Sequence, residues 1–336
     1  NEGSRSYSCS PALAMFSTYL LYAVSFIVGS LAIGLYIFQC NLIYPASFPT
    51  GSRSVVMKPS QFGLPYKDVT ITTKDNILLQ CYLLQQKDED VAKNSPTIIY
   101  FHANAGNMGH RLPIAKIFFE NFGCNVFMLS YRGYGLSGGS PNEKGLKVDA
   151  EAALEYIKEH PVLGNTPLIA YGQSIGGAVA IYTVSRNEDK FSALILENTF
   201  LNMPELIPNV IPALRHFMFL CHQIWPSHRD ILAVRKTPTL FLSGSMDELV
   251  PSSHMRKLYD LCDTRGPKFW KEFEEGTHND TCLKPGYFEA IGEFIRDEVW
   301  KLVNGSMEDE KRDNGADKAP NAHVENGGAN TEKDGM

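Results

Sequence analysis

The sequence predicts an α/β protein built on a mostly parallel, doubly wound sheet. Short apolar runs of strand length alternate with amphipathic stretches of helical spacing between residues 65 and 303. Such alternation is typical of parallel strands joined by helices that cover both faces of a sheet. A second observation is the stretch 168–177, LIAYGQSIGG, in which an apolar strand passes through a sharp turn directly into a helix. A third is an uncharged N-terminal run, which predicts one transmembrane helix outside the sheet.

The elements follow from the periodicity of apolar residues. The expected strands are residues 69–72, 77–84, 97–101, 125–129, 168–171, 193–196, 239–243 and 269–273. The expected helices are residues 112–122, 143–160, the run after Gly176, 253–263 and 287–302. The first two strands flank the polar residues 74–76, which predicts a hairpin leading into the sheet. Residues 85–94 are polar and are expected to form a loop.

Composition divides the chain into successive parts. We expect an N-terminal flank (1–11), a transmembrane anchor (12–38), a linker (39–64), a folded domain (65–303) and a disordered tail (304–336). The linker contains a stretch rich in proline and serine at 45–59. The tail is charged, rich in glycine and asparagine and without aromatic residues, so it cannot bury enough apolar surface to fold.

The anchor is predicted from length and the absence of charge. Residues 12–38 contain no charged side chain, and at about 1.5 Å per residue they exceed a hydrocarbon core of roughly 30 Å. A signal peptide is the alternative, but its apolar region is shorter, and no small-residue cleavage site follows Phe38. We therefore expect a single-pass membrane protein, with the membrane and the orientation left open.

Charge and cysteine content exclude several classes of function. The 336-residue chain carries a formal net charge of −6 and has no basic stripe, which argues against a nucleic-acid partner. The seven cysteines are scattered and form no C-x-x-C pair, so neither a zinc site nor a redox motif is indicated. We expect no metal and no cofactor.

The turn at residues 172–176, GQSIG, has the G-x-S-x-G pattern of a nucleophile elbow. This turn holds Ser174 in a strained backbone conformation, and glycines are needed on both sides because a Cβ there would collide with the turn. Its hydroxyl would be exposed at the start of a helix, beside backbone N–H groups that can hold an oxyanion. Ser174 is therefore the predicted nucleophile.

A serine nucleophile needs a base and an acid, which follow it along the chain in this architecture. Asp247 lies in the loop after the expected strand 239–243, and His278 lies in the loop after the expected strand 269–273. Both loops leave the carboxyl ends of strands, where open α/β sheets bind their ligands. His278 would take the proton of Ser174, and Asp247 would orient the imidazole. Glu248 and Glu197 are the alternative acids.

The loop after strand 97–101, with the sequence HANAGN at 102–107, is where an oxyanion donor is expected. We assign the two donors to the backbone N–H groups of Asn104 and Ile175.

A glycine-rich motif that could indicate a dinucleotide site is rejected: Gly133, Gly135 and Gly138 form G-x-G-x-x-G after a strand. A dinucleotide site would need that motif to begin a helix directly and an acidic residue at a later strand end, and neither is present.

An insertion at residues 200–229 interrupts the alternation of strands and helices. It combines several prolines with a dense apolar set that includes Phe217, Met218 and Trp225. Because a solvated loop does not tolerate so many apolar residues, we expect a short helical lid that packs on the core, lines a pocket or touches lipid.

Together the anchor and the motifs HANAGN, SYRGYGLSGG, YGQSIGGAVA, LENTF, SGSMDELVP and GTHND resemble the α/β-hydrolase family. Within it the resemblance is closest to the membrane-anchored group of alpha/beta-hydrolase domain-containing protein 13. It implies an α/β-hydrolase fold over about residues 65–299 and a membrane serine hydrolase. The family usually has glycine where this chain has Ala103, and a positive φ at that position would displace the oxyanion loop.

We therefore expect a membrane-anchored serine hydrolase that cleaves carboxylic esters or thioesters through Ser174, Asp247 and His278. The apolar insertion and the anchor favour acyl-lipids or palmitoylated proteins as substrates, and the resemblance to protein depalmitoylases, which share GQSIG and HND-like segments, implies thioester cleavage. A serine peptidase of the same fold and a non-catalytic adaptor are the alternatives. The sequence identifies no protein partner.

Overall fold

The computed structural model describes residues 11–263 and 265–301. The predicted tail 304–336, the first ten residues of the predicted flank and the end of the last expected helix at residue 302 lie outside this part of the chain.

The centre of the molecule is one eight-stranded sheet, with the strand order β1-β2-β4-β3-β5-β6-β7-β8. The strands are β1 (Lys67–Thr72), β2 (Leu78–Leu84), β3 (Thr97–Phe101), β4 (Asn125–Leu129), β5 (Leu168–Gln173), β6 (Ala193–Glu197), β7 (Thr239–Gly244) and β8 (Lys268–Phe273). β2 pairs antiparallel with both β1 and β4, whereas all other neighbours pair parallel. The prediction of a mostly parallel sheet led in by a hairpin is confirmed.

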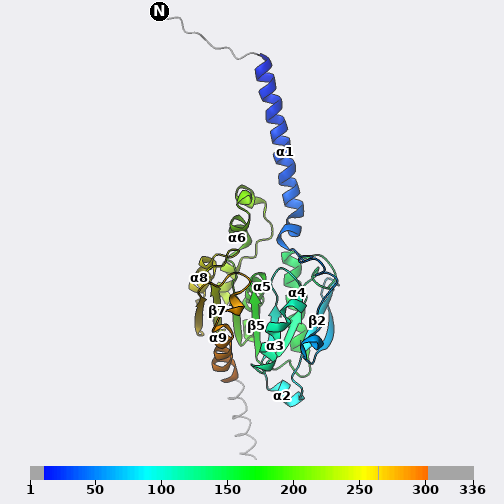
Figure 1. Cartoon of the computed structure of the whole chain (residues 1–336), viewed down its shortest axis with the longest axis vertical. Helices are drawn as coiled ribbons and strands as arrows, with labels where there is room; N and C mark the ends of the chain where they lie inside the picture. The colour runs from blue at the N-terminus through cyan, green and yellow to red at the C-terminus, as the bar shows by residue number, and fades with distance from the viewer. Residues whose placement is uncertain (1–10, 264, 302–336) are drawn as a thin grey trace, which may run out of the picture.

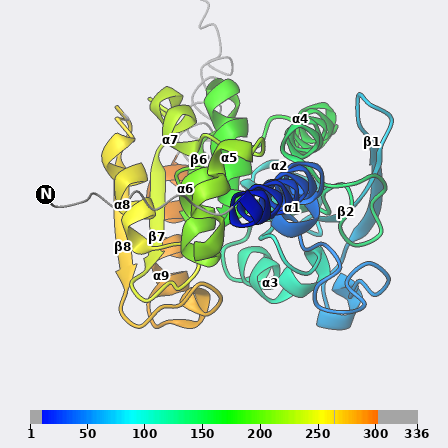
Figure 2. The same ribbon diagram turned by 90° about the horizontal axis from the view of Figure 1, so that it is seen from above.

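Helices cover both faces of the sheet because successive strand residues point to opposite sides. α4 (Glu143–Glu159), α5 (Ile175–Arg186) and α8 (Ser252–Leu261) bury apolar side chains in one core cluster. α3 (Leu112–Glu120) and α9 (Tyr287–Phe294) contribute to a second cluster. Figure 2 shows α4 and α5 on one side of the sheet and α3 and α9 on the other. A π-helical segment, Ile295–Trp300, continues α9.

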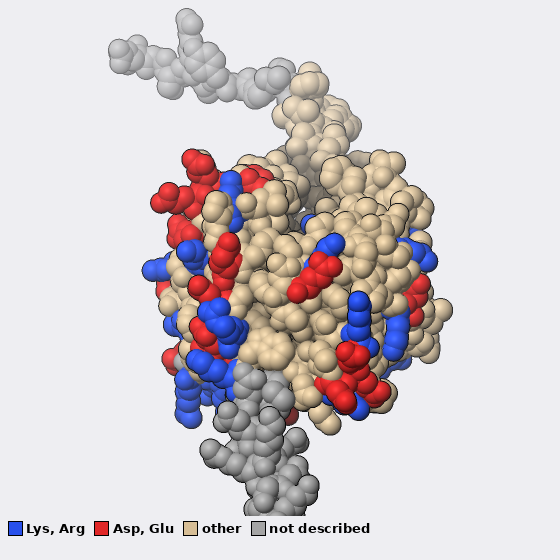
Figure 3. Space-filling view, turned by 60° about the horizontal axis from the view of Figure 1, so that its bottom comes forward, with Lys and Arg blue, Asp and Glu red and all other residues tan. Residues whose placement is uncertain are grey.

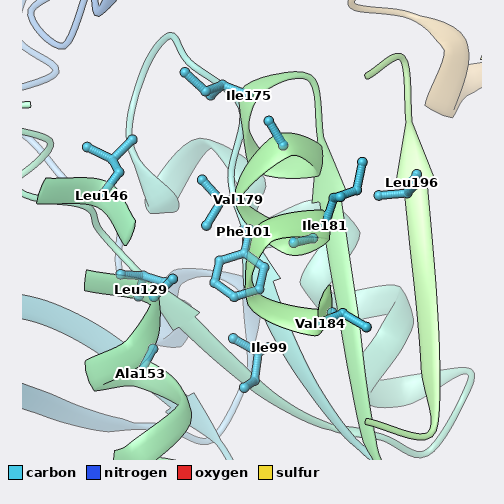
Figure 4. Close-up of a cluster of buried hydrophobic side chains, with 14 of the residues drawn as sticks. Ile99, Phe101, Leu129, Leu146, Ala153, Ile175, Val179, Ile181, Val184 and Leu196 are labelled. Atoms are coloured by element: carbon cyan, nitrogen blue, oxygen red, sulfur yellow. The ribbon is translucent and has the colours of Figure 1, made fainter. Parts of the chain in front are cut away.

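α5 lies at the centre of the larger core cluster, and its position fixes the position of Ser174. Val179 and Val184 of this helix, shown in Figure 4 beside Phe101 of β3, are fully buried. The helix can approach the sheet closely because Gly177 has no Cβ. A Cβ at this position would collide with the side chain of Thr199. Burial of this face holds the start of α5 against the carboxyl end of β5.

α1 (Pro11–Ile43) projects from the side of the domain that carries α6 (Figure 1). The stretch Met15–Ile43 is long and apolar enough to cross a membrane, and its most apolar part is not buried against the domain. The part of α1 visible in Figure 3 carries no charged side chain. Within this described range, the prediction of an N-terminal apolar helix is confirmed.

The segment expected to be a linker differs from a flexible connection. α1 continues past Phe38 to Ile43, and Gln39, Tyr44 and Ser52 are buried against the domain. A 3-10 helix, η1 (Pro59–Phe62), precedes β1. The expected anchor boundary was drawn at the first polar side chains, but Gln39 finds hydrogen-bond partners in the insertion, so the helix does not end there.

The expected loop 85–94 also contains a helix, α2 (Glu89–Lys93). Two acidic residues in its first turn and Lys93 in its last turn complement the helix dipole. Lys93 and Glu89 form an ion pair with 3.1 Å between Nζ and Oε1. Ala92 is fully buried in the core cluster, so packing against the domain holds this short helix in place and the charges support it.

The insertion 200–229 folds into short helices above the carboxyl ends of the strands. They are α6 (Met203–Val210), the 3-10 helix η4 (Pro212–Leu220) and α7 (Ser227–Asp230). α6 ends before Pro212 because the residue that precedes a proline is disfavoured in helical conformation, and Ile211 has φ −134° and ψ 85°.

Candidate active site

Ser174 lies at the turn between β5 and α5 with φ 57° and ψ −118°, a conformation that non-glycine residues rarely adopt. Its backbone N–H donates to the carbonyl oxygen of Glu197 on the neighbouring strand β6, with 2.8 Å between N and O. A Cβ at Gly172 would collide with the backbone of Gly176, and a Cβ at Gly176 would collide with the carbonyl of Phe101. The two glycines of the motif are therefore required by close backbone packing.

The structure brings the three predicted catalytic side chains together. His278 Nε2 lies 3.1 Å from Ser174 Oγ, and His278 Nδ1 lies 2.8 Å from Asp247 Oδ2. All three residues are buried, with 7 to 8% of their surface exposed. If Nδ1 donates to Asp247, Nε2 is left to accept the proton of Ser174.

The loop after β7 holds Asp247 in place. Its Oδ1 accepts hydrogen bonds from the backbone N–H groups of Leu249 (2.9 Å) and Val250 (2.7 Å), which leaves Oδ2 for the histidine. Glu248, an alternative acid in the sequence, instead accepts from the backbone N–H of His278 at 3.2 Å. It therefore bonds to the main chain of the histidine, whereas Asp247 bonds to the ring.

Glu197, the other alternative acid, lies beneath the site in a buried polar cluster. Its Oε2 accepts from the hydroxyls of Tyr171 (2.7 Å) and Tyr287 (2.5 Å), and its Oε1 accepts from Gln173 Nε2 (3.1 Å). Burial raises the pKa of this carboxyl, and the tyrosine hydrogen bonds oppose the rise. The sequence did not reveal this cluster because Tyr287 lies 90 residues from Glu197.

Ala103, in the predicted oxyanion loop, does not have the positive φ that would favour a glycine, so an alanine fits without strain. His102 is fully buried, and burial lowers its pKa to about 3, so it is neutral at physiological pH. Its Nδ1 donates to the carbonyl of Ala103 at 2.7 Å.

Asn104 makes side-chain contacts that were not predicted. Its Nδ2 donates to the carbonyl oxygen of Ile43, at the end of α1, with 2.5 Å between N and O. Its Oδ1 accepts from the hydroxyl of Tyr134 at 2.5 Å. The last carbonyls of a helix have no partner within the helix, so Asn104 caps α1 and links it to the oxyanion loop.

A cavity of about 390 Å³ lies over Ser174 and His278. Most of its lining is apolar and comes from α1, the oxyanion loop, the lid insertion and the loop after β7. The insertion contributes Phe200, Met203, Leu206, Ile207, Val210, Ile211, Leu214, Phe217, Met218, Leu220 and Cys221. None of the described residues that line the cavity is an aspartate or a glutamate. The volume falls within the range of small-molecule binding sites.

Arg111 is a charged residue of the cavity wall that sequence reasoning missed. One guanidinium nitrogen donates to the carbonyl oxygen of Ala105 at 3.1 Å, so the side chain braces the oxyanion loop. Its Nε is buried without a hydrogen-bond partner in the described part of the chain. In residues 11–263 and 265–301 no group of three or more His, Cys, Asp or Glu side chains is arranged to hold a metal ion.

The chain is similar in sequence to several known proteins. A family model described as serine aminopeptidase, S33, matches residues 92–235. Protein bem46 of Schizosaccharomyces pombe is 48% identical over 273 residues, which cover 81% of this chain and 90% of that protein. An alpha/beta hydrolase domain-containing protein of Arabidopsis thaliana, WAV2, is 36% identical over 72% of this chain and 82% of its own. The chain belongs to the α/β-hydrolase family.

Solved structures agree with this assignment at the level of the fold. An esterase of Pyrococcus furiosus superposes on this α/β-hydrolase with a TM-score of 0.61 and 18% identity, over 73% of this chain and 95% of the esterase. An α/β-hydrolase of Vibrio vulnificus has a TM-score of 0.62 and 19% identity, over 76% of this chain and 92% of its own. At such identities the likeness concerns the fold alone.

Proposed function

We propose that this α/β-hydrolase is a membrane-anchored serine hydrolase that cleaves carboxylic esters or thioesters of long acyl chains. The observation that carries the proposal is the relay from Ser174 through His278 to Asp247, with spacings of 3.1 and 2.8 Å, at the base of an apolar cavity. Such spacing is what a serine needs to be activated by a histidine base.

The proposed reaction proceeds through an acyl-enzyme. Ser174 Oγ attacks the carbonyl carbon and its proton moves to His278 Nε2, while the carbonyl oxygen becomes an oxyanion held by the N–H groups of Ile175 and Asn104. The alcohol or thiol then leaves with the proton from His278. Water, deprotonated by the same histidine, attacks the acyl-enzyme and releases the carboxylic acid and free Ser174.

The cavity supports an acyl substrate. Eleven apolar or weakly polar side chains of the lid insertion line it, together with residues of α1. Burial of an acyl chain there contributes about 0.8 kcal/mol for each methylene removed from water. Acyl-lipids and acylated proteins both carry such chains next to an ester or thioester carbonyl.

Membrane anchoring is proposed from α1. The helix is long and apolar enough to span a bilayer, and its most apolar part is not buried against the domain. A relative from Saccharomyces cerevisiae, 41% identical over 72% of this chain and 84% of its own, is described as an uncharacterized membrane protein. A single-pass protein with its cavity beside the anchor is suited to lipid substrates.

The peptidase alternative fits the cavity less well. The matched family model is described as a serine aminopeptidase, and an aminopeptidase must bind the α-ammonium group of its substrate. A buried ammonium needs an acidic partner, whereas the described lining residues include no carboxylate and one arginine.

A non-catalytic adaptor is the other alternative. Such a protein has no need of a serine, a histidine and an aspartate within hydrogen-bond distance of one another.

The test uses a fluorophosphonate probe, which labels only activated serines, and p-nitrophenyl esters. The full chain should be labelled and should hydrolyse both acetyl and octanoyl esters, and Ser174→Ala should abolish both activities. We expect a loss in kcat on the order of 10⁶ by analogy with other serine hydrolases. Thermal unfolding of the variant serves as the control for folding.

Three outcomes separate the candidates. Labelling lost in Ser174→Ala at an unchanged Tm supports the serine hydrolase. A folded wild-type chain that is neither labelled nor active on any ester would support the adaptor. Faster cleavage of aminoacyl p-nitroanilides than of esters would favour the peptidase.

A further inference from the structure

One face of α1 belongs to the cavity. Leu35, Gln39, Leu42 and Ile43 all line the same space as Ser174 and His278. They fall at positions i, i+4, i+7 and i+8 of the helix, so they share one helix face. Ile37 lies on the opposite face and is 61% exposed. The helix that is proposed to anchor the enzyme therefore also closes its cavity on one side.

Hydrogen bonds fix this face of α1 against the lid insertion. Gln39 is only 7% exposed, although it follows the uncharged run 12–38. Its Nε2 donates to the carbonyl of Leu220 at 3.1 Å, and its Oε1 accepts from the backbone N–H of His222 at 2.8 Å. A buried glutamine that satisfies both ends of its amide specifies one position of its helix.

Two further contacts join the end of α1 to the domain. The Tyr44 hydroxyl donates to Gln223 Oε1 and accepts from Trp225 Nε1, both at 2.8 Å. The Ile43 carbonyl accepts from the side chain of Asn104, the residue whose backbone N–H is the proposed oxyanion donor. α1 is thus bonded both to the insertion and to the oxyanion loop.

We propose that α1 forms one wall of the acyl-chain site, and that the acyl chain of a membrane-resident ester or thioester lies along its Leu35–Ile43 face when the carbonyl reaches Ser174. The proposal rests on the proposed function for the reaction itself. It adds that the membrane helix determines acyl-chain selectivity and that the chain enters from the bilayer beside α1. The substrate class is therefore an amphiphile whose acyl chain already resides in the membrane.

The first test compares two substitutions in α1 of the full chain reconstituted in vesicles. Leu35→Trp fills the cavity from the helix side, whereas Ile37→Trp adds the same ring to the opposite face. We expect Leu35→Trp to lower kcat/KM for the octanoyl ester by about fourfold for each methylene excluded from the cavity. The octanoyl-to-acetyl ratio of kcat/KM should therefore fall in Leu35→Trp, and Ile37→Trp should leave that ratio at the wild-type value.

A second variant keeps the test decisive if Leu35→Trp fails to fold. Leu35→Ala enlarges the same end of the cavity, so the preferred p-nitrophenyl ester should shift toward longer chains. The proposal is overturned if acetyl and octanoyl esters change by the same factor in both Leu35 variants. An equal change of selectivity in Ile37→Trp would also overturn it, because the effect would then come from the membrane and not from the cavity.

A covalent probe locates the chain directly. An alkyl fluorophosphonate reacts when Ser174 Oγ bonds to phosphorus and fluoride leaves, while the serine proton passes to His278. With a diazirine at the far end of the alkyl chain, illumination should crosslink the probe to the peptide that contains residues 35–43. Crosslinks found only in α6 and η4 would contradict the proposal but leave the proposed function intact. Absence of any Ser174 labelling would instead refute the proposed function.

Discussion

Asn104 is the residue at which the loop after β3 and the end of α1 meet. The sequence predicted its backbone N–H as an oxyanion donor from the position of the loop after β3, and this role stays a prediction. Its side chain makes two contacts that no local pattern could indicate, because Ile43 and Tyr134 lie 61 and 30 residues away. One residue thus joins the end of α1 to the loop that is predicted to hold the oxyanion.

Substitution of Asn104 should separate these contacts. Asn104→Ala keeps the backbone N–H but loses both side-chain bonds, so we expect kcat for acetyl esters to fall by about tenfold with little change in KM, because small displacements of a catalytic group are costly. Asn104→Asp retains an acceptor for Tyr134, loses the donor to Ile43 and adds a negative charge beside the site, so its kcat should fall at least as far. Steady-state kinetics of both variants measure this, and wild-type kcat in both would show that the side chain does not position the loop.

At the scale of the element, an ion-pair network joins the turn of the β1–β2 hairpin to the loop after β4 and to α4. Arg132 donates to Asp75 in the hairpin turn (2.6 and 2.9 Å) and through Nε to Asp149 of α4 (2.8 Å). Asp149 is fully buried. The turn at residues 74–76 was predicted, but its partner 57 residues away was not, because sequence spacing does not show which loops meet.

The hairpin network predicts a dependence of stability on pH. Hydrogen bonds from Arg132 hold the pKa of Asp75 well below its usual range. A lowered folded-state pKa stabilises the fold above the usual value of about 3.9 and stops doing so as pH falls through the folded-state pKa. The difference in unfolding free energy between wild type and Asp75→Asn should therefore be present at pH 7 and shrink below about pH 4. Urea unfolding measures it, and a difference that grows on acidification would be contrary to this assignment.

The lid insertion provides a second test of the cavity at this scale. Met218 lines the cavity, whereas its neighbour Phe219 is 80% exposed. Met218→Trp should lower kcat/KM for octanoyl esters severalfold while acetyl ester hydrolysis stays near wild type, because excluded methylenes lose about 0.8 kcal/mol each. Phe219→Trp is the matched control. Equal losses for both esters in Met218→Trp would mean that the insertion only covers the core.

For the whole molecule, the proposed anchor predicts how the protein behaves in membrane extraction. The described helix α1 carries no charge that could tether it by electrostatics alone, so the full chain should remain with membranes through high salt and alkaline carbonate. Deletion of residues 1–39 should release the chain from membranes, and acetyl ester hydrolysis should be reduced but still measurable, since Ser174, Asp247 and His278 remain while one wall of the cavity is lost. Immunoblots of the fractions measure this, and a full chain released by carbonate would argue against a spanning helix.

Local patterns account for what could be predicted of the fold. The apolar runs of β3 to β7, the glycines around Ser174 and the loops that carry Asp247 and His278 all have signals within a few residues. Contacts between distant segments do not, and these shape the cavity: Gln39 meets Leu220 and His222, and Tyr44 meets Gln223. Sequence reasoning therefore treated residues 39–64 as a linker, whereas their first residues join the anchor to the candidate site.

The side of the domain from which α1 leaves, which also carries α6 (Figure 1), sets how this enzyme would meet its substrate. With the anchor inserted, the cavity is held beside the bilayer surface, so encounters occur by lateral diffusion in two dimensions. Turnover then follows the mole fraction of substrate in the membrane and not its amount per volume of solution. Adding inert lipid would slow the reaction even though the total quantity of substrate stays the same.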